Sequence, residues 1–144
     1  MAGALLDTHT LLWLANGDNL SDDALEAIAE NQAAGTLYAS PITGWELALA
    51  AQKPPAAHRP DLGGLEAAAW FRAALDATGA RLIPVKQRIA LEAAAVATVF
   101  ARKDPGDCFL IATARIRRIP IITRDVPMRN LALAQPDYLR VIVC

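Results

Sequence analysis

The chain has 144 residues, of which 54% are hydrophobic and 20% charged, so length and composition predict one folded domain and exclude a disordered chain. The net charge of −1 excludes a strongly basic, histone-like nucleic-acid binder, and two cysteines are too few for a disulfide framework or a four-thiolate zinc site. The apolar stretches are too short for a membrane-spanning helix and no basic region precedes the first one, so we expect a cytoplasmic protein without signal peptide or membrane contact.

Strand and helix signals alternate along the first half of the chain. Ser21 is an N-cap residue at the start of a helix that Gly35 ends. Ser40 and Pro41 begin another helix, which ends before Pro54. The pattern predicts strands over 4–6 and 36–39, helices over 8–16, 22–34 and 65–78, and a surface loop over 53–64.

The second half of the chain continues this alternation. Asp104 and Pro105 occupy the cap and the first position of a helix that runs through Arg118. Short runs of β-branched residues favour strands over 81–85, 120–123 and 138–143, and a further helix is predicted over 87–102. Strands that alternate with helices in this way predict a three-layer α/β fold with a parallel sheet of four to five strands, in a single domain over 1–144.

Acidic side chains lie at corresponding places relative to the predicted strands. Asp7 follows the first strand directly, and Asp125 follows the fourth strand with one residue between them. Glu46 lies in the second turn of the helix after the second strand, while Asp104 and Asp107 open the helix before the fourth strand. Because the carboxyl ends of parallel strands meet at one edge of a sheet, we expect these acids to gather there.

Each of these acids also has an ordinary structural interpretation. Asp104 suits an N-cap, Asp107 the positive end of a helix dipole, Glu46 an exposed helix face and Asp125 a turn. Carboxylates gathered together, however, repel one another and raise one another's pKa, and a divalent cation with oxygen ligands relieves that repulsion. We therefore predict that Mg²⁺ or Mn²⁺ binds Asp7, Asp107 and Asp125, with Glu46 and Asp104 as further candidate ligands, and activates water for attack on a phosphate.

Basic residues are concentrated in the second half of the chain. There are 4 basic and 10 acidic residues up to Ile83, but 10 basic and 5 acidic residues from Lys86 onward. This surplus predicts contacts with nucleic-acid phosphates, foremost through Arg124, next to the last acid, and Arg115, about 12 Å along its helix from Asp107. The alternative is that these side chains only solvate the surface or hold helix carbonyls. The other arginines of this region are Arg117, Arg118 and Arg129.

The chain carries, in this order, the segments LLDTHTLLW, SPITGWELA, RKDPGDCFLIATA and IITRD. Their order and spacing resemble the PIN-domain ribonucleases, and above all the VapC-type toxins of bacterial toxin–antitoxin pairs. The resemblance implies a metal-dependent endoribonuclease built on a parallel sheet. Its catalytic acids match Asp7, Glu46, Asp107 and Asp125, while Asp104 matches a frequent additional acid and Thr123 a recurrent hydroxyl residue beside the last acid.

The same resemblance implies three partners for the chain. They are an RNA substrate, a second copy of the chain, and a cognate antitoxin that lies along the N-terminal helices between Thr8 and about Phe71. The high apolar fraction agrees with covered surfaces, as do Trp13, Trp45 and Trp70 at helical apolar positions, although an ordinary core would explain both.

Two residues depart from the pattern of the family. Gly106 and Cys108 stand where the DPFDR block of the family often has an aromatic residue and an arginine. We expect Cys108 to be a buried helix residue, because no histidine near it in sequence would activate the thiol. His9, two residues after Asp7, is expected to be a packed or surface residue.

Two other functions fit parts of the pattern. An aspartate-nucleophile phosphatase would also place an acid like Asp7 after its first strand, but the DxDx[TV] pattern of that class is absent because position 9 is histidine. A PIN-fold interaction module without nuclease activity is the second alternative, and the presence of all the acids argues against it.

Overall fold

A parallel sheet of five strands forms the centre of the described part of this computed structural model, which comprises residues 3–54 and 59–144. The strands are β1 (Ala4–Leu6), β2 (Leu37–Ala39), β3 (Arg81–Leu82), β4 (Ile121–Thr123) and β5 (Val141–Val143). Their order across the sheet is β3-β2-β1-β4-β5, and all neighbouring pairs are parallel. The predicted α/β fold with a parallel sheet is therefore confirmed.

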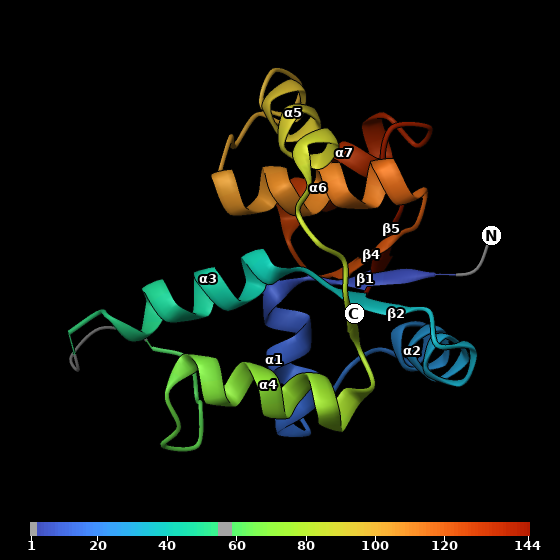
Figure 1. The fold of residues 1–144 in the computed structure, drawn as a ribbon. Helices are drawn as coiled ribbons and strands as arrows, with labels where there is room; N and C mark the ends of the chain where they lie inside the picture. Colours follow the sequence, from blue (N-terminus) through green and yellow to red (C-terminus); the bar gives the residue numbers. More distant parts are fainter. Residues whose placement is uncertain (1–2, 55–58) are drawn as a thin grey trace.

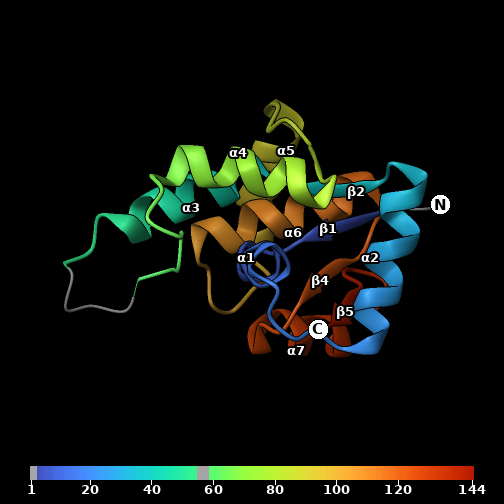
Figure 2. The same ribbon diagram turned by 90° about the horizontal axis from the view of Figure 1, so that it is seen from below.

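Helices cover both faces of the sheet, which gives the three predicted layers (Figure 1). They are α1 (Thr8–Asn16), α2 (Asp22–Ala34), α3 (Pro41–Ala51), α4 (Ala67–Thr78), α5 (Gln87–Val96), α6 (Pro105–Arg117) and α7 (Val126–Ala134). The last three helices lie on one face, and α1, α2 and α4 lie on the other, as the view from below also shows (Figure 2). α3 starts at the carboxyl edge of the sheet and contacts both α4 and α6.

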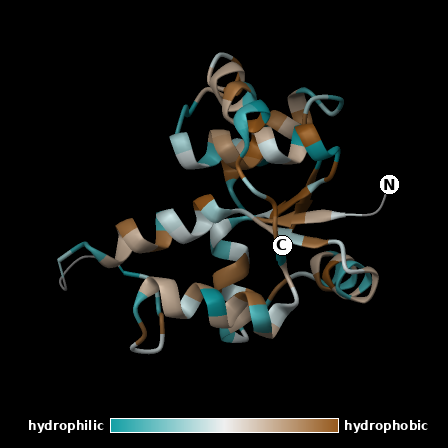
Figure 3. Cartoon of the chain, in the orientation of Figure 1, coloured by the Kyte–Doolittle hydropathy of each residue, from teal (hydrophilic) through white to brown (hydrophobic). Residues whose placement is uncertain are grey.

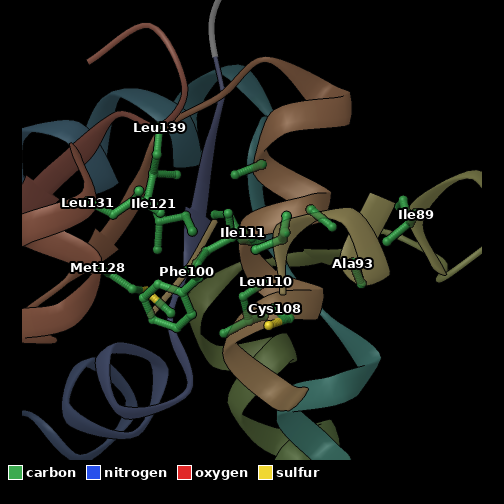
Figure 4. Close-up of a cluster of buried hydrophobic side chains, with 14 of the residues drawn as sticks. Ile89, Ala93, Phe100, Cys108, Leu110, Ile111, Ile121, Met128, Leu131 and Leu139 are labelled. Carbon is green, nitrogen blue, oxygen red and sulfur yellow. The ribbon is translucent and has the colours of Figure 1, made fainter. Parts of the chain in front are cut away.

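The central strands are buried on both sides because successive side chains point to opposite faces. Leu5 and Ile121 pack in a cluster with residues of α5, α6 and α7, which Figure 4 shows around Phe100. Leu6 and Ile122 pack in a second cluster with residues of α1, α2 and α4. The strands are accordingly hydrophobic on both faces and stand out in brown at the centre of Figure 3.

Local capping signals place the helix ends where the sequence predicts them. The Ser21 hydroxyl and the Asp104 carboxylate each accept a hydrogen bond from the backbone N–H three residues further on, and the Ser40 hydroxyl accepts one from two residues further on. Gly35 and Gly79 end α2 and α4 in the left-handed region, with φ of 71° and 73°. Most other boundaries lie within two residues of the prediction.

Several elements in the second half are shorter than predicted. The predicted helix over 87–102 ends as α5 at Val96, because the chain then turns and buries Phe100 in the core. The strands predicted over 81–85 and 138–143 shrink to β3 and β5, the two edge strands. Arg118 lies outside α6, as its C-cap in the left-handed conformation.

α7 is a helix that was not predicted from the sequence. Asp125 is interpreted above as a turn or site residue, yet it is also the N-cap of this helix. Its Oδ2 accepts a hydrogen bond from the backbone N–H of Met128 at 3.0 Å, and Pro127 lies in the first turn. An acid followed closely by proline was therefore a helix-start signal as well.

None of the described helices is long and apolar enough to cross a membrane. The predicted loop over 53–64 lies partly outside the described residues, which omit 55–58. Its described flanks, 53–54 and 59–64, contain no helix or strand, in agreement with the prediction.

Candidate functional site

Acidic side chains from four chain segments lie at the carboxyl edge of the sheet. Asp7 follows β1 as the N-cap of α1, and Asp125 follows β4 as the N-cap of α7. Glu46 lies on α3, while Asp104 and Asp107 lie at the start of α6. Figure 1 shows the beginnings of α1, α3 and α6 on the same side of the molecule. The sheet topology thus brings together the acids that the sequence analysis selected.

The tightest group of these acids differs from the predicted one. Glu46, Asp104 and Asp107 each offer a carboxylate oxygen, and these atoms all lie within 4.8 Å of one another. The predicted main ligands are Asp7, Asp107 and Asp125, with Glu46 and Asp104 only as further candidates. Asp104 does cap α6, through a 3.1 Å hydrogen bond from the N–H of Asp107, and it also belongs to the acidic group.

Asp7 is buried and held in one orientation by two hydrogen bonds. Its Oδ1 accepts from the backbone N–H of Thr8 at 2.7 Å, and its Oδ2 accepts from the Thr123 hydroxyl at 2.6 Å. The Thr123 oxygen in turn accepts from the backbone N–H of Asp125 at 2.9 Å. Thr123, which is fully buried, therefore links the first and the last acid of the site.

Glu46 is oriented by residues that the sequence analysis did not select. The Thr8 hydroxyl donates to Glu46 Oε1 at 2.7 Å, and it lies 3.0 Å from the hydroxyl of Thr43. The Glu46 carboxylate also lies directly over Gly106, where an added Cβ would come within 2.7 Å of its carbon. The glycine that replaces an aromatic residue of the family pattern thus makes room for this acid.

Burial and mutual repulsion raise the proton affinity of the site. Burial, together with the charges of Asp104, Asp7 and Asp125, raises the pKa of Asp107 to about 8, although nearby Arg102 acts in the opposite direction. Burial is also the main cause that raises the pKa of Asp7, against the lowering effect of its hydrogen bonds, and the pKa of Glu46. Burial and the neighbouring carboxylates therefore both favour the protonated form of these acids in the metal-free protein.

Arg102 is the functional candidate that the sequence analysis missed. Its Nη1 lies 2.7 Å from Asp125 Oδ1 and 3.7 Å from Asp107 Oδ2. The acids therefore have a basic partner, which offsets part of their mutual repulsion. Their charges, Asp107 foremost, raise the pKa of the Arg102 guanidinium. The available signal was its place two residues before Asp104, but the prediction put Arg102 in the preceding helix.

The two arginines predicted to contact phosphate occupy different environments. Arg124 lies at the site: its guanidinium is 4.1 Å from the Trp13 ring centroid, and it donates a hydrogen bond to the Asn19 carbonyl. Arg115 lies near the other end of α6, where it donates at 2.8 Å both to Glu92 Oε1 and to the carbonyl of Tyr138. The structure does not bring Arg115 to the acids.

A cleft of about 930 Å³ extends from the acids along α1 and α3. Leu12, Trp13, Trp45 and Leu49 give it an apolar wall. Trp45 is 47% exposed, whereas Trp70 is buried in the core and contributes nothing to this surface. The cleft therefore combines an acidic end with an apolar stretch.

Two remaining residues match their expected structural roles. His9 is exposed at the cleft, with its ring centroid 5.8 Å from that of Trp13. Cys108 is buried in α6, and burial raises the pKa of its thiol, which disfavours a thiolate nucleophile. The chemistry of the site thus depends on its carboxylates.

The donor set fits a hard divalent cation. The grouped ligand atoms of Glu46, Asp104 and Asp107 are all carboxylate oxygens, the ligand type that Mg²⁺ and Mn²⁺ prefer. Burial foremost, and then the charges of Asp104, Asp7 and Asp125, raise the pKa of Asp107, and a bound cation would offset the repulsion between these carboxylates. The site can therefore hold a divalent metal ion.

Comparison with known proteins agrees with this geometry. The PIN domain family matches residues 4–133 of the chain. No curated protein matches the sequence significantly. Solved structures, in contrast, match over nearly the full length, and they come from toxin–antitoxin complexes.

Three of these structures illustrate the likeness. A chain of DNA-bound VapBC from Salmonella typhimurium is 18% identical, with a TM-score of 0.62 over 99% of this chain and 98% of that chain. A chain of VapBC2 from Rickettsia felis, bound to a promoter DNA fragment, is 12% identical with a TM-score of 0.66 over 97% of both chains. VapBC-5 from Mycobacterium tuberculosis gives 21% identity and a TM-score of 0.57 over 99% of this chain and 98% of that chain. At these identities the likeness establishes a shared fold.

Proposed function

Because this chain belongs to the PIN domain family, we propose that it is a metal-dependent endoribonuclease and the toxin of a toxin–antitoxin pair. The convergence of five acids from four chain segments at one sheet edge carries the nuclease proposal. The shared fold with chains of VapBC complexes supports the toxin role. We propose that residues 1–144 act as one nuclease domain, on RNA in the cytoplasm.

The proposed metal ligands are Glu46, Asp104 and Asp107, whose oxygens lie closest together, with Asp7 and Asp125 beside them. When bound, Mg²⁺ or Mn²⁺ lowers the pKa of a water and stabilises charge on the leaving oxygen of the phosphodiester. Glu46 is fixed for this role by the hydroxyl of Thr8. The catalytic acids proposed from the sequence, Asp7, Glu46, Asp107 and Asp125, are retained.

Asp7 is proposed to accept the proton of the attacking water. Its two hydrogen bonds hold the carboxylate in one orientation, and burial raises its pKa toward the range in which a carboxylate is an effective base. Thr123 is the positioning residue for this group, because its hydroxyl donates to Asp7 and accepts from the backbone of Asp125.

The direct test is cleavage of single-stranded RNA by the purified protein with Mg²⁺ or Mn²⁺. We expect cleavage with either ion, none with a chelator, and none by Asp7→Asn, which keeps the shape of the side chain but removes its charge. Asp76→Asn on α4 is the matched control, because Asp76 is exposed and lies outside the cleft. Full metal-dependent cleavage by Asp7→Asn would contradict the assignment.

The same preparation distinguishes the two alternatives. An aspartate-nucleophile phosphatase would hydrolyse small phosphate esters and form a covalent intermediate on Asp7. An inactive interaction module would bind its partner but cleave neither substrate. RNA cleavage without a trapped covalent intermediate would support the nuclease proposal over both.

A cognate antitoxin is the proposed protein partner, and the cleft along α1 and α3 is its proposed docking surface. Trp45 and Leu49 lie one turn apart on α3, line the cleft and are each nearly half exposed. Such an apolar wall favours a partner segment with apolar side chains, and the acidic end favours a basic group on the same segment.

We also propose that the chain forms a homodimer, as the family resemblance implies. Exposed apolar side chains outside the cleft, such as Leu91 on α5 and Leu133 on α7, provide surface that a second copy could cover. Sedimentation of the purified chain as a monomer at micromolar concentration would contradict this proposal.

A further inference from the structure

Arg102 differs from the other arginines of the chain in what its side chain contacts. It lies on the turn between α5 and α6, two residues before Asp104. Its guanidinium pairs with Asp125 and Asp107. Among the described residues, it is the one basic side chain that forms an ion pair with the acidic group.

The burial of the three partners indicates that this ion pair serves the site rather than the fold. The Arg102 side chain is 47% exposed, whereas the side chains of Asp107 and Asp125 are 12% and 19% exposed. An ion pair with a half-exposed member contributes little to stability, so folding gains little from Arg102. The two acids, in contrast, are largely buried beside further carboxylates, and the Arg102 guanidinium offsets part of their negative charge.

A guanidinium and a divalent cation compete for the same carboxylates. Two positive charges beside the same acids repel each other, so each lowers the affinity of the site for the other. Arg102 has a long side chain on an exposed turn, and the next residue, Lys103, adopts a left-handed conformation with φ of 56°. The guanidinium can therefore leave the acids without disturbing a helix or strand.

We propose that Arg102 is an internal counter-ion of the acidic site, which pairs with the carboxylates in the metal-free protein and turns to the phosphate of the RNA strand once a divalent cation is bound. The second half of this proposal rests on the proposed nuclease function. Arginine suits the role because its planar guanidinium binds carboxylate and phosphate with the same paired geometry. Arg102 is thus a competitor of the metal and a binding residue for the substrate.

The first test measures Mn²⁺ binding to the metal-free protein by calorimetry, without any nuclease assay. We expect Arg102→Gln to bind Mn²⁺ about tenfold more tightly than the unmodified chain. Lys103→Gln is the matched control: it removes the same charge one residue away, from an exposed side chain without an ion pair to the acids. Its effect should be small at about 0.15 M salt, where exposed charges are screened. Arg102→Lys, which keeps the charge, should fall between the two.

The second test measures RNA cleavage at saturating Mn²⁺. We expect Arg102→Gln to raise KM for RNA by about tenfold and to change kcat less, because it removes a phosphate contact from the loaded site. Lys103→Gln should leave both constants unchanged. A purely structural role for Arg102 would instead lower the thermal stability of the Mn²⁺-loaded protein and move KM and kcat together.

Equal Mn²⁺ affinities for Arg102→Gln and Lys103→Gln would overturn the counter-ion proposal, whether or not the chain cleaves RNA. An unchanged KM in Arg102→Gln would overturn its substrate-binding half. Conversely, a chain that binds Mn²⁺ as expected but cleaves no RNA would contradict the proposed function and leave the counter-ion proposal standing.

Discussion

Asp107 links the stability of the metal-free protein to pH. Its pKa rises from 3.8 to about 8 on folding, so between these values the folded state binds a proton that the unfolded state releases. The stabilising effect is complete below the lower value and is lost as the pH rises through about 8. Asp7 and Glu46, whose pKa values are also raised, act in the same direction.

We therefore predict that the metal-free protein melts at lower temperature as the pH rises from about 5 to about 8, with a slope that Asp107→Asn reduces by up to about 1.4 kcal/mol per pH unit. Near pH 8 the variant should melt above the unmodified chain, because asparagine resembles the protonated acid. Thermal melts in a chelating buffer measure this, with Asp76→Asn as control. Parallel curves for the two variants would contradict the prediction.

Gly106 leaves the space that the Glu46 carboxylate occupies. A methyl group at this position would meet the Glu46 carboxylate at 2.7 Å, and the flexible end of Glu46 can move away. Gly106→Ala should therefore keep the fold, with a gain in helix propensity of up to about 1 kcal/mol, while Mn²⁺ affinity falls about tenfold or more.

Gly44→Ala provides the contrast to this substitution. It is also a glycine in a helix, but its added methyl meets the ring of Phe71 at 2.9 Å instead of an acid. We expect Gly44→Ala to lower the melting temperature and to leave Mn²⁺ affinity unchanged. If Gly106→Ala binds Mn²⁺ as tightly as the unmodified chain, Glu46 is not a ligand.

At the scale of elements, the sequence predicts best what is encoded locally. Helix starts at Ser21, Ser40 and Asp104 depend on cap residues that act within one turn, and the structure places them as predicted. The central strands could be predicted because they are buried on both faces and therefore apolar, whereas the edge strand β3 is exposed. Parallel pairing of the strands follows from the alternation of strands and helices along the chain, so the sheet edge at which the acids lie could be predicted.

The errors occur where tertiary packing decides the conformation. Residues 97–102 have a helical pattern, but burial of Phe100 in the core ends α5 at Val96 and folds the chain back. Arg102 reaches the acids because of this reversal. Its place two residues before Asp104 was the available signal, but the helical pattern of residues 97–102 put it in the preceding helix. α7, in contrast, has a local start signal in Asp125 and Pro127. It was not predicted because Asp125 was interpreted as a turn or site residue alone.

Thr123 at the end of β4 connects the sheet to the site, which gives a prediction for this element. Thr123→Val removes the hydroxyl that donates to Asp7 and accepts from the N–H of Asp125. Leaving these buried groups without a partner should lower the free energy of unfolding by about 1–3 kcal/mol and weaken Mn²⁺ binding.

Thr113→Val is the matched control for urea unfolding. Thr113 is equally buried, but its hydroxyl donates only to the Phe109 carbonyl within α6. That carbonyl keeps its helical hydrogen bond, so the variant should change stability little and Mn²⁺ affinity not at all. Equal losses of stability in the two variants would mean that Thr123 has no special role at the site.

At the scale of the whole molecule, the cleft offers one continuous surface from the acids to the exposed side of α3. We predict that the product of the adjacent reading frame co-purifies with this chain, and that Trp45→Ala weakens that complex by about tenfold or more, since buried aromatic anchors dominate interfaces. Leu133→Ala is the control, because Leu133 is 81% exposed on α7, away from the cleft.

The partner prediction has two separate ways to fail. Absence of any co-purifying product would contradict the existence of the complex. A complex that survives Trp45→Ala unchanged would show that the partner uses another surface. Titration calorimetry of the purified pair gives the affinities for both variants and for the unmodified chain.

The different environments of Arg124 and Arg115 predict the path of RNA across the molecule. Phosphate contacts release counterions, so each one adds about 0.7 to the slope of log affinity against log salt for a single strand. Arg124 lines the cleft next to Asp125, whereas Arg115 is occupied by Glu92 and Tyr138.

We therefore expect Arg124→Gln, made in the inactive Asp7→Asn protein, to weaken RNA binding equally for all sequences and to flatten the salt dependence by about one phosphate. Arg115→Gln should lower stability through the lost contacts with Glu92 and Tyr138, yet leave the salt slope unchanged. A flattened salt slope for Arg115→Gln alone would contradict this prediction. It would mean that RNA crosses the far end of α6, and that the basic residues of the second half bind RNA on a face away from the cleft.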